Sequence, residues 1–372
     1  MQDKAVNHRV KLMLHAFKSE QQIGEKEEED SSLNQKSFSS SRNESSSSSS
    51  SSSSVEENYW EDLQTYSNKL KEIMMRKIPK REKGFSCMNF GFHSQLSVSR
   101  NELERYHAKQ IGISYHQGVI LVNVYSWNRS LPDAIQVFDL YSREFKQSIV
   151  FEKVKNKSLL FRIEENYDGM HNDALLLADA HTISKYALKT FLNCKNEGEL
   201  TSSFIWRNEK SCSCIIDWIT ILPSEKQVYI CASHIVVLNL ESGECIRTFE
   251  LGEHAQFLRR IEFMDSETMI VFHRGASIFQ KDQEQTWKKI QDLKQTSSFK
   301  MDMVFYDSLS KLILTSTEIS QDLSIYNQDG QLLKSIITQD ITQKIKLPRG
   351  MCVNFLTGEL LLCLDDLVVS LL

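Results

Sequence analysis

The chain has 372 residues, of which 41% are hydrophobic and 25% charged, and its formal net charge is −5. These values are ordinary for a globular protein, and they give no overall basic field of the kind that attracts nucleic acid or anionic lipid. The 8 cysteines lack the dense spacing of a disulfide framework, and no run of about 18 apolar residues predicts a membrane span. No apolar signal-peptide centre is found near the N-terminus, so we expect a cytoplasmic location, with the nucleus as the alternative.

Residues 1–57 differ in composition from the rest of the chain. Between positions 31 and 54, 16 of 24 residues are serine, and the last ten of these are consecutive. Such a segment has too little apolar surface to offset the entropy lost on ordering. We therefore predict a disordered, serine-rich tail over residues 1–57.

Residues 59–78 show the helical period. Apolar side chains recur at steps of three and four, at Tyr59, Leu63, Tyr66, Leu70, Ile73 and Met74. Pro79 then ends the pattern, and a short basic stretch follows. We expect residues 58–83 to form one amphipathic helix and a basic linker. The helix either packs on its own domain, captures a partner helix, or contacts a membrane surface or nucleic acid.

From about residue 110 onward, short apolar runs separated by turn-forming residues replace the helical period. The runs cover residues 119–122, 174–178, 228–231, 269–272, 312–314 and 360–363. Helices would need longer amphipathic stretches. Short strands at regular spacing are typical of an all-β sandwich, barrel or propeller.

An internal repeat decides among these architectures. The strand "IQVFD" at 135–139 returns as "IVVLN" at 235–239 and "LSIYN" at 323–327, with weaker copies at 182–186, 276–280 and 367–370. The residues that close the copies lie 41 to 53 positions apart: Asp139, Tyr186, Asn239, Gln280, Asn327 and Ser370. Asp and Asn favour turns at such positions, and four-stranded propeller blades repeat at about 40 to 50 residues. We therefore predict an all-β, six-bladed propeller over residues 84–372.

Each blade should begin with an inner strand. We place five of these at 111–115, 215–221, 261–264, 301–305 and 351–355, and a less clear one at 159–163. The last blade ends with residues 367–372 and has room for only three strands. We expect residues 84–92 to supply its fourth strand, which would close the ring and remove an open sheet edge.

The segment "GISYHQGVILV" at 112–122, followed by "AIQVFDL" at 134–140, resembles a blade of the NHL-repeat propellers. The resemblance implies six blades, and it also implies protein-binding or RNA-binding roles known in that family. It is good in the first blade and partial in the third and fifth. Tyr115 replaces the family's usual inner-strand Asp, and an insertion displaces Asn128 and Arg129. The chain has no CxxC pair that could bind the zinc of a RING module.

Motifs of catalysis are missing from the sequence. It contains no glycine-rich phosphate loop, GxSxG elbow or HExxH helix. Cys212 and Cys214 would share one side of a strand, where a metal pair or ordinary sheet cysteines are the alternatives. We expect no enzyme activity, no metal and no cofactor.

Two sets of residues are candidate functional positions. Aromatic and Arg side chains on loops often anchor protein interfaces, which selects Trp127, Arg129, Trp206 and Arg207, although either Trp could equally cover a blade edge. Polar residues on or beside inner strands would line a central channel, which selects Asp217, Glu262, Asp302 and Asn354.

The sequence as a whole favours a non-catalytic protein-interaction scaffold with a protein partner that the residues do not identify. One alternative is a propeller hydrolase or lactonase with a metal in the channel, which requires carboxylates and amides that converge on the axis. The other is an RNA-binding NHL-type propeller, which the net charge does not favour.

Overall fold

The computed structural model describes ten segments of the chain: residues 92–98, 106–126, 131–151, 159–209, 214–252, 258–273, 275–293, 301–317, 322–337 and 348–371. The predicted tail (residues 1–57) and the predicted helix with its basic linker (58–83) lie outside these segments, as do Trp127, Arg129 and Cys212. The chain divides into two units between Ile73 and Met74, and every described residue belongs to the second unit.

The described strands form six antiparallel sheets of four strands each, which we number as blades in chain order. Blade 1 holds β2 (His107–Ser114), β3 (Val119–Tyr125), β4 (Asp133–Asp139) and β5 (Phe145–Phe151). Blade 2 holds β6 (Leu160–Glu164), β7 (Ala174–Asp179), β8 (Thr182–Ala187) and β9 (Phe204–Asn208). Blade 3 holds β10 (Trp218–Leu222), β11 (Gln227–Cys231), β12 (Ile235–Asn239) and β13 (Cys245–Phe249).

The other three blades repeat this plan. Blade 4 holds β14 (Arg260–Phe263), β15 (Thr268–Phe272), β16 (Ala276–Lys281) and β17 (Trp287–Asp292). Blade 5 holds β18 (Met301–Asp307), β19 (Leu312–Thr317), β20 (Asp322–Tyr326) and β21 (Leu332–Ile337). Blade 6 holds β22 (Pro348–Val353), β23 (Leu360–Leu364), β24 (Leu367–Leu371) and, from the other end of the chain, β1 (Phe92–Ser97).

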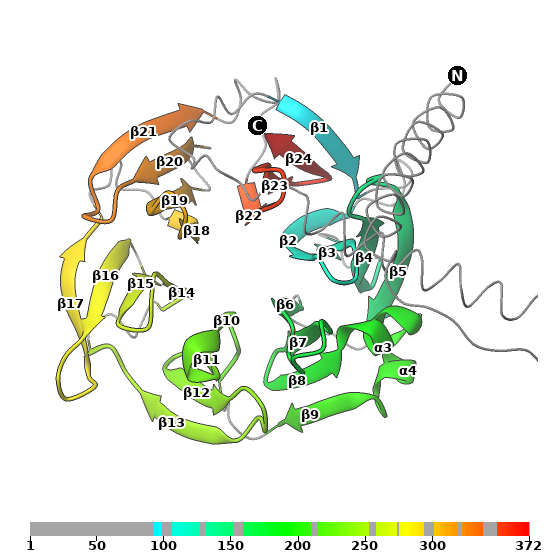
Figure 1. Ribbon diagram of the computed structural model, residues 1–372, viewed down its shortest axis with the longest axis horizontal. Helices are drawn as coiled ribbons and strands as arrows, with labels where there is room; N and C mark the ends of the chain where they lie inside the picture. The colour runs from blue at the N-terminus through cyan, green and yellow to red at the C-terminus, as the bar shows by residue number, and fades with distance from the viewer. Residues whose placement is uncertain are drawn as a thin grey trace, which may run out of the picture. The chain divides into compact units, whose positions relative to one another are not determined.

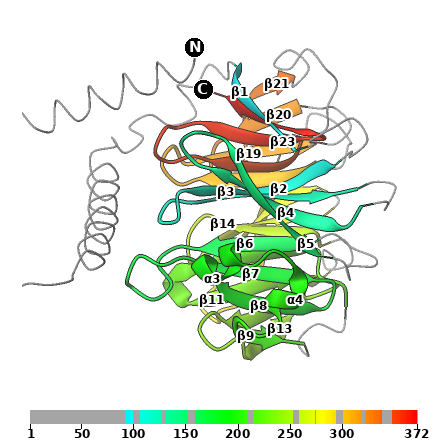
Figure 2. The ribbon, with the colours of Figure 1, turned by 90° about the vertical axis from the view of Figure 1, so that its right-hand side faces the viewer.

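The six sheets close into a ring. The first strand of each blade contacts the first strands of both neighbouring blades, all the way from β2 through β6, β10, β14, β18 and β22 back to β2 (Figure 1). Seen from the side, the strands of one blade lie next to one another, as β6, β7 and β8 do in Figure 2. The predicted six-bladed, all-β propeller is confirmed.

Blade 6 combines the two ends of the described chain. β1 pairs antiparallel with β24, with Phe92 opposite Leu371 and Ser97 opposite Leu367. The sequence placed this strand at residues 84–92, but the strand that pairs with β24 is Phe92–Ser97; the rest of the predicted segment lies outside the described residues. The position was hard to predict because Leu96 and little else of this outer strand is buried.

The second strand of each blade is apolar on both sides because each sheet packs between two others. In β3, Val119 and Leu121 belong to the core between blades 1 and 2, whereas Ile120 and Val122 belong to the core between blades 6 and 1. Strand side chains alternate between the two faces of a sheet. A strand buried on both faces therefore reads as a continuous apolar run, which explains the runs seen in the sequence.

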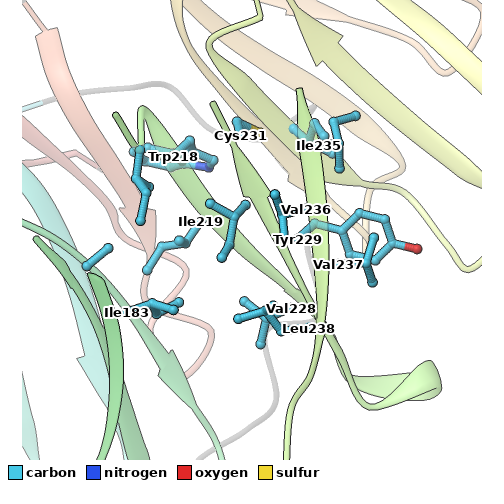
Figure 3. Close-up of a cluster of buried hydrophobic side chains, with 14 of the residues drawn as sticks. Ile183, Trp218, Ile219, Val228, Tyr229, Cys231, Ile235, Val236, Val237 and Leu238 are labelled. Carbon is cyan, nitrogen blue, oxygen red and sulfur yellow. The ribbon is translucent and has the colours of Figure 1, made fainter. Parts of the chain in front are cut away.

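The largest core cluster joins blades 2, 3 and 4. In Figure 3, Ile219 and Val228 of blade 3 lie on the side of Ile183 from blade 2, and Tyr229 points to the opposite side. On that opposite side the Tyr229 ring meets the Phe263 ring of blade 4 edge-on, with 4.7 Å between ring centroids. Adjacent blades are thus joined by interdigitated side chains, and no blade has a core of its own.

The repeated motif is the third strand of a blade and the turn that follows it. Asp139 Oδ1 accepts hydrogen bonds from the backbone N–H groups of Tyr141 and Ser142, both at 2.9 Å. Asn239 Oδ1 makes the equivalent bonds in blade 3 at 2.8 and 2.9 Å. Such side-chain bonds nucleate a turn. All six predicted repeat markers fall on a third strand or directly after it.

Each of these turns continues with a residue in the left-handed region. Gly243 and Gly330 adopt φ of 73° and 65° in blades 3 and 5, and Arg143 takes the same role in blade 1 with φ of 63°. Glycine adopts this conformation without steric cost, whereas an L side chain is disfavoured there. The strain at Arg143 therefore needs compensation from its contacts.

Blade 2 departs from the repeat between its third and fourth strands. Two short helices, α3 (Leu188–Asn193) and α4 (Glu197–Leu200), replace the tight turn there. They bury Leu188, Phe191 and Leu200 against blades 1 and 2. These helices were not predicted from the sequence, because six residues or fewer give no readable helical period.

We expect Gly243→Ala to destabilise the fold by more than the strain of an L residue in the left-handed region. A Cβ at Gly243 would overlap the indole ring of Trp206, whereas Gly169, with almost the same φ of 74° against 73°, has no atom within 4 Å of that position. Both substitutions carry left-handed strain of about 1 kcal/mol, and Gly243→Ala adds overpacking of about 1–3 kcal/mol. Thermal unfolding of the two variants measures the difference. Equal decreases in Tm would show that the Trp206 side chain moves away from the added methyl group without loss of stability.

Candidate functional site

The predicted partner-binding residues Trp206 and Arg207 lie in strand β9, not in a loop as the sequence suggested. Trp206 is buried, and its Nε1–H donates a 3.1 Å hydrogen bond to the Leu240 carbonyl of blade 3. It therefore fills the seam between blades 2 and 3. Arg207 is exposed, and its Nε pairs with the Glu209 carboxylate at 2.9 Å.

The predicted channel residues take four different positions. Glu262 lies in β14, and Asp217 is exposed just before β10, where its N–H donates to the Cys231 carbonyl at 2.8 Å. Asp302 lies in β18, with its side chain outside the described part. Asn354 is buried beyond the end of β22, where its Nδ2 donates to Glu359 at 3.1 Å. Asn354 thus supports the turn between β22 and β23.

Glu262 belongs to a charged network on the first strands of blades 2, 3 and 4. Its carboxylate pairs with Arg162 Nη2 at 3.1 Å, and Arg162 Nε donates to the Ile219 carbonyl at 2.9 Å. The guanidinium carbons of Arg162 and Arg260 lie 4.6 and 3.9 Å from the Trp218 ring centroid. Burial raises the pKa of Glu262, and the two arginines oppose that shift. Of this network only Glu262 was predicted from the sequence, because Arg162 and Trp218 lie on the first strands of two other blades, β6 and β10, and Arg260, on β14 with Glu262, carries no sequence signal of its own.

We call one side of the ring the turn face: it carries the first-to-second strand turns of all six blades and the third-to-fourth connections of blades 1 to 5. Both kinds of turn lie at the same end of a four-stranded meander. Salt bridges join them within and between blades: Lys226–Glu241 at 2.6 Å in blade 3, Glu225–Lys281 at 2.5 Å between blades 3 and 4. Lys281 is buried, so its pairing with Glu225 satisfies a charge that would otherwise be costly.

Glu359 holds the turn face together where blade 6 meets blade 1. Its carboxylate accepts hydrogen bonds from the hydroxyls of Thr357 and Ser370 at 2.7 and 2.8 Å, and from Asn354 Nδ2 at 3.1 Å. Arg143 Nη2 reaches the same carboxylate from blade 1 at 2.5 Å. Glu359 is buried and Arg143 is partly buried, so this ion pair ties the β4–β5 turn to blade 6.

Two exposed aromatic side chains flank this ion pair. Tyr141 is 49% exposed in the β4–β5 turn, and Phe355 is 42% exposed in the β22–β23 turn. Tyr115 connects them: its hydroxyl accepts from the Phe355 N–H at 2.7 Å and donates to the Val353 carbonyl at 3.3 Å. Gly118 of the same turn lies against the Tyr141 ring. We call Tyr115, Tyr141 and Phe355 the aromatic seam.

The aromatic seam continues into blade 2 through a buried carboxylate. Asp173 accepts from His116 Nδ1 at 2.7 Å, from the Asn166 N–H at 2.9 Å, and from the Ser114 hydroxyl. The Ser114 hydroxyl bonds to Asp173 and not to His116, so the three residues do not form a nucleophile–base pair. The same β6–β7 loop exposes Met170, at 72%. This cluster fixes the β6–β7 loop beside the β2–β3 turn.

The turns of blades 3, 4 and 5 are acidic. They carry eight carboxylates and two lysines: Glu225, Glu241, Glu244, Asp265, Glu267, Asp282, Glu284, Asp329, Lys226 and Lys311. We call these the acidic turns. The turn face therefore presents exposed aromatic groups over blades 6 and 1 and a net negative charge over blades 3 and 4, while the turns of blade 5 hold one acid, Asp329, and one lysine, Lys311.

The described cysteines are free thiols. Burial raises the pKa of Cys352 to about 12 and also raises the pKa of Cys231 and Cys363, which disfavours the reactive thiolate. Cys214 accepts a 2.9 Å hydrogen bond from the Ser233 hydroxyl. Within the ten described segments, no three His, Cys, Asp or Glu side chains gather in a group that could hold a metal ion.

Comparisons with known proteins give no family and no curated relative: no family model matches the chain, and no curated protein matches it. Among solved structures, the computationally designed Ika8 protein matches over 71% of each chain, with 10% sequence identity and a TM-score of 0.42. A similarity this low supports no argument about function. No helix in the described part of the chain is long and apolar enough to cross a membrane.

We expect Glu359→Gln to weaken the fold at neutral pH. Burial alone would raise the pKa of Glu359, but the Thr357 hydroxyl and the Arg143 guanidinium hold it below its usual value. Because the folded-state pKa is depressed, the carboxylate stabilises the fold above about pH 4.3, and this contribution is lost as pH falls through the folded pKa. Removing one partner of a buried ion pair costs about 3 kcal/mol.

Urea unfolding at pH 7 and near pH 3 checks this expectation. The difference in the free energy of unfolding between the wild type and Glu359→Gln should be smaller at the lower pH. Glu241→Gln is the control, because the Glu241–Lys226 pair at 2.6 Å is solvent-exposed on both sides and is expected to contribute under about 1 kcal/mol. A similar decrease in the free energy of unfolding in both variants would contradict the role given to Glu359.

Proposed function

We propose that this protein is a non-catalytic protein-interaction scaffold whose turn face binds a protein partner. The observation that carries the proposal is the aromatic seam: two large aromatic side chains, Tyr141 and Phe355, exposed on turns that buried hydrogen bonds and the Arg143–Glu359 ion pair hold in place. Aromatic residues are enriched among the anchors of protein interfaces.

The fixed geometry of these turns favours binding. Association costs free energy when loops and side chains must be ordered. Here the Asp139 side chain already bonds two N–H groups of the Tyr141 turn, and Glu359 ties that turn to blade 6. A partner that covers Tyr141 and Phe355 would therefore spend little binding energy on ordering the backbone.

Kinship with the NHL-repeat propellers is part of the same proposal. It is supported by the blade 1 segment at 112–140, in which the inner strand, the glycine turn at Gly118 and the "IQVFD" strand follow one another. A cytoplasmic or nuclear location accompanies this proposal, because such a scaffold would meet its partners there.

The test is capture of partners by the full-length chain from its native lysate, quantified by mass spectrometry. Tyr141→Ser with Phe355→Ser should reduce at least one specifically retained protein by about tenfold, the effect of losing one anchor worth about 1.4 kcal/mol. The matched control is Ile290→Ser with Leu333→Ser, which removes two similarly exposed apolar side chains (54% and 57%) from the outer strands β17 and β21.

If the aromatic-seam variant and the control variant retain every captured protein equally, the aromatic seam is not the binding surface and the proposal is overturned. Both variants should show the Tm of the wild type, because exposed side chains outside the core change stability little. Turnover of ester or lactone substrates by the purified protein would also overturn a non-catalytic role.

A further inference from the structure

The chain joins the propeller on its turn face. β24 begins beyond the turn at Asp365 and Asp366 and ends at Leu371, so its last residue lies at the end of blade 6 that other blades use for their third-to-fourth turns. Phe92 pairs with Leu371 at that end. The next residue, His93, places Nε2 3.6 Å from Glu359 Oε1. The chain that precedes Phe92 is therefore attached on the turn face near Glu359, the residue whose hydrogen bonds and ion pair hold the turns of the aromatic seam.

The sequence just before Phe92 has two parts. Residues 76–83 read "RKIPKREK" and hold five basic residues against one acid, Glu82. Residues 84–91 read "GFSCMNFG" and hold three large apolar side chains: Phe85, Met88 and Phe90. From Phe92 outward, the chain is thus apolar first and basic second.

The turn face shows the complementary order. Phe92 is itself 53% exposed, and its neighbour His93 contacts Glu359, which also pairs with Arg143 of the turn that carries the exposed Tyr141. Farther around the ring lie the acidic turns of blades 5, 4 and 3. An extended chain covers at most about 3.5 Å per residue. Lys83 can therefore lie about 30 Å from Phe92 and Arg76 about 55 Å, which suffices to span several blades.

We propose that residues 76–90 of this chain bind its own turn face, with the apolar part on the aromatic seam and the basic part along the acidic turns. Several observations select this occupant: the segment is covalently attached beside the seam, its apolar residues come first, and its charge is opposite to that of the turns. Attachment raises its effective concentration to the millimolar range, so weak contacts suffice.

This binding would regulate the function proposed above, a step that rests on that proposal. A segment that covers Tyr141 and Phe355 competes with any protein partner for the same surface. A partner for this face would itself combine apolar anchors with basic residues, since it must displace a segment of that composition. The segment is then a built-in competitor.

The experiment is limited trypsin proteolysis of the full-length chain, followed by mass spectrometry. Trypsin cleaves after Lys and Arg, so cleavage within residues 76–83 reports whether that stretch is covered. Cleavage after Arg42, in the serine-rich stretch, is the internal reference. We expect cleavage within 76–83 to be about tenfold slower than after Arg42 at low salt, and to approach the reference rate near 1 M salt, where the screening length is about 3 Å.

Two variants test the two halves of the surface separately. Glu267→Gln, Glu284→Gln and Asp329→Asn together neutralise three exposed acidic-turn residues and should restore rapid cleavage at low salt. Tyr141→Ser with Phe355→Ser should do so in part. Glu209→Gln, Glu250→Gln and Asp366→Asn together neutralise three exposed acids outside the acidic turns; this variant is the charge-matched control and should leave the protection unchanged.

Cleavage within 76–83 at the Arg42 rate in the wild type would overturn the proposal, as would protection that the acidic-turn variant leaves intact. Protection that grows with protein concentration would also overturn it, because the segment would then bind a second copy. The proposed function fails independently. When Arg76, Lys77, Lys80, Arg81 and Lys83 are all replaced by Gln, partner capture should increase. If the wild-type chain shows the expected protection of residues 76–83 but neither the wild type nor this variant captures a partner, the scaffold role is removed while the binding of the segment remains.

Discussion

The structure depends on one constraint: each sheet is buried on both faces by its neighbours. Val119 and Ile120 are adjacent in β3, yet they belong to the cores of different seams. A single blade would leave both of its apolar faces in water, at a cost of roughly 25 cal/mol per Å². The blades are therefore stable only as a complete ring. β1 completes blade 6, because without it β24 would be an open sheet edge.

Polar side chains fix how adjacent blades are aligned. Gln110 of blade 1 both donates to and accepts from the Phe161 backbone of blade 2, at 2.5 and 3.0 Å. Lys185 of blade 2 donates to the Leu240 carbonyl of blade 3 at 2.9 Å and pairs with Glu164 at 2.7 Å. Apolar packing is non-directional, whereas a buried polar group left without its partner is costly. These contacts therefore select one alignment of the blades, and the turns at their ends inherit a fixed position.

The turn face shows how a surface arises from this scaffold. Arg143 occupies a backbone conformation that blades 3 and 5 give to glycine, and its guanidinium reaches Glu359 in blade 6. The same ion pair brings Tyr141 and Phe355 onto one rigid surface. Trp206 illustrates the opposite outcome: its residue type suggested an interface anchor, but the blade 2–blade 3 seam buries it beside Gly243. Residue type alone did not separate the two cases, because both depend on which blade is the neighbour.

The blade count, the third strands and their turns could be predicted from the residues alone. They follow from local side-chain alternation and from the hydrogen bonds that Asp139, Asn239 and Asn327 make to the nearby backbone. Strand β1 was placed incorrectly from the sequence, and the helices of blade 2 were missed, since outer strands and single helical turns leave weak periodic signals. Only the tertiary structure decided the rest: that Glu262 is paired with Arg162, and that Tyr141 and Phe355 share a surface with Glu359. These groups come from blades distant in sequence, and ring closure alone brings them together.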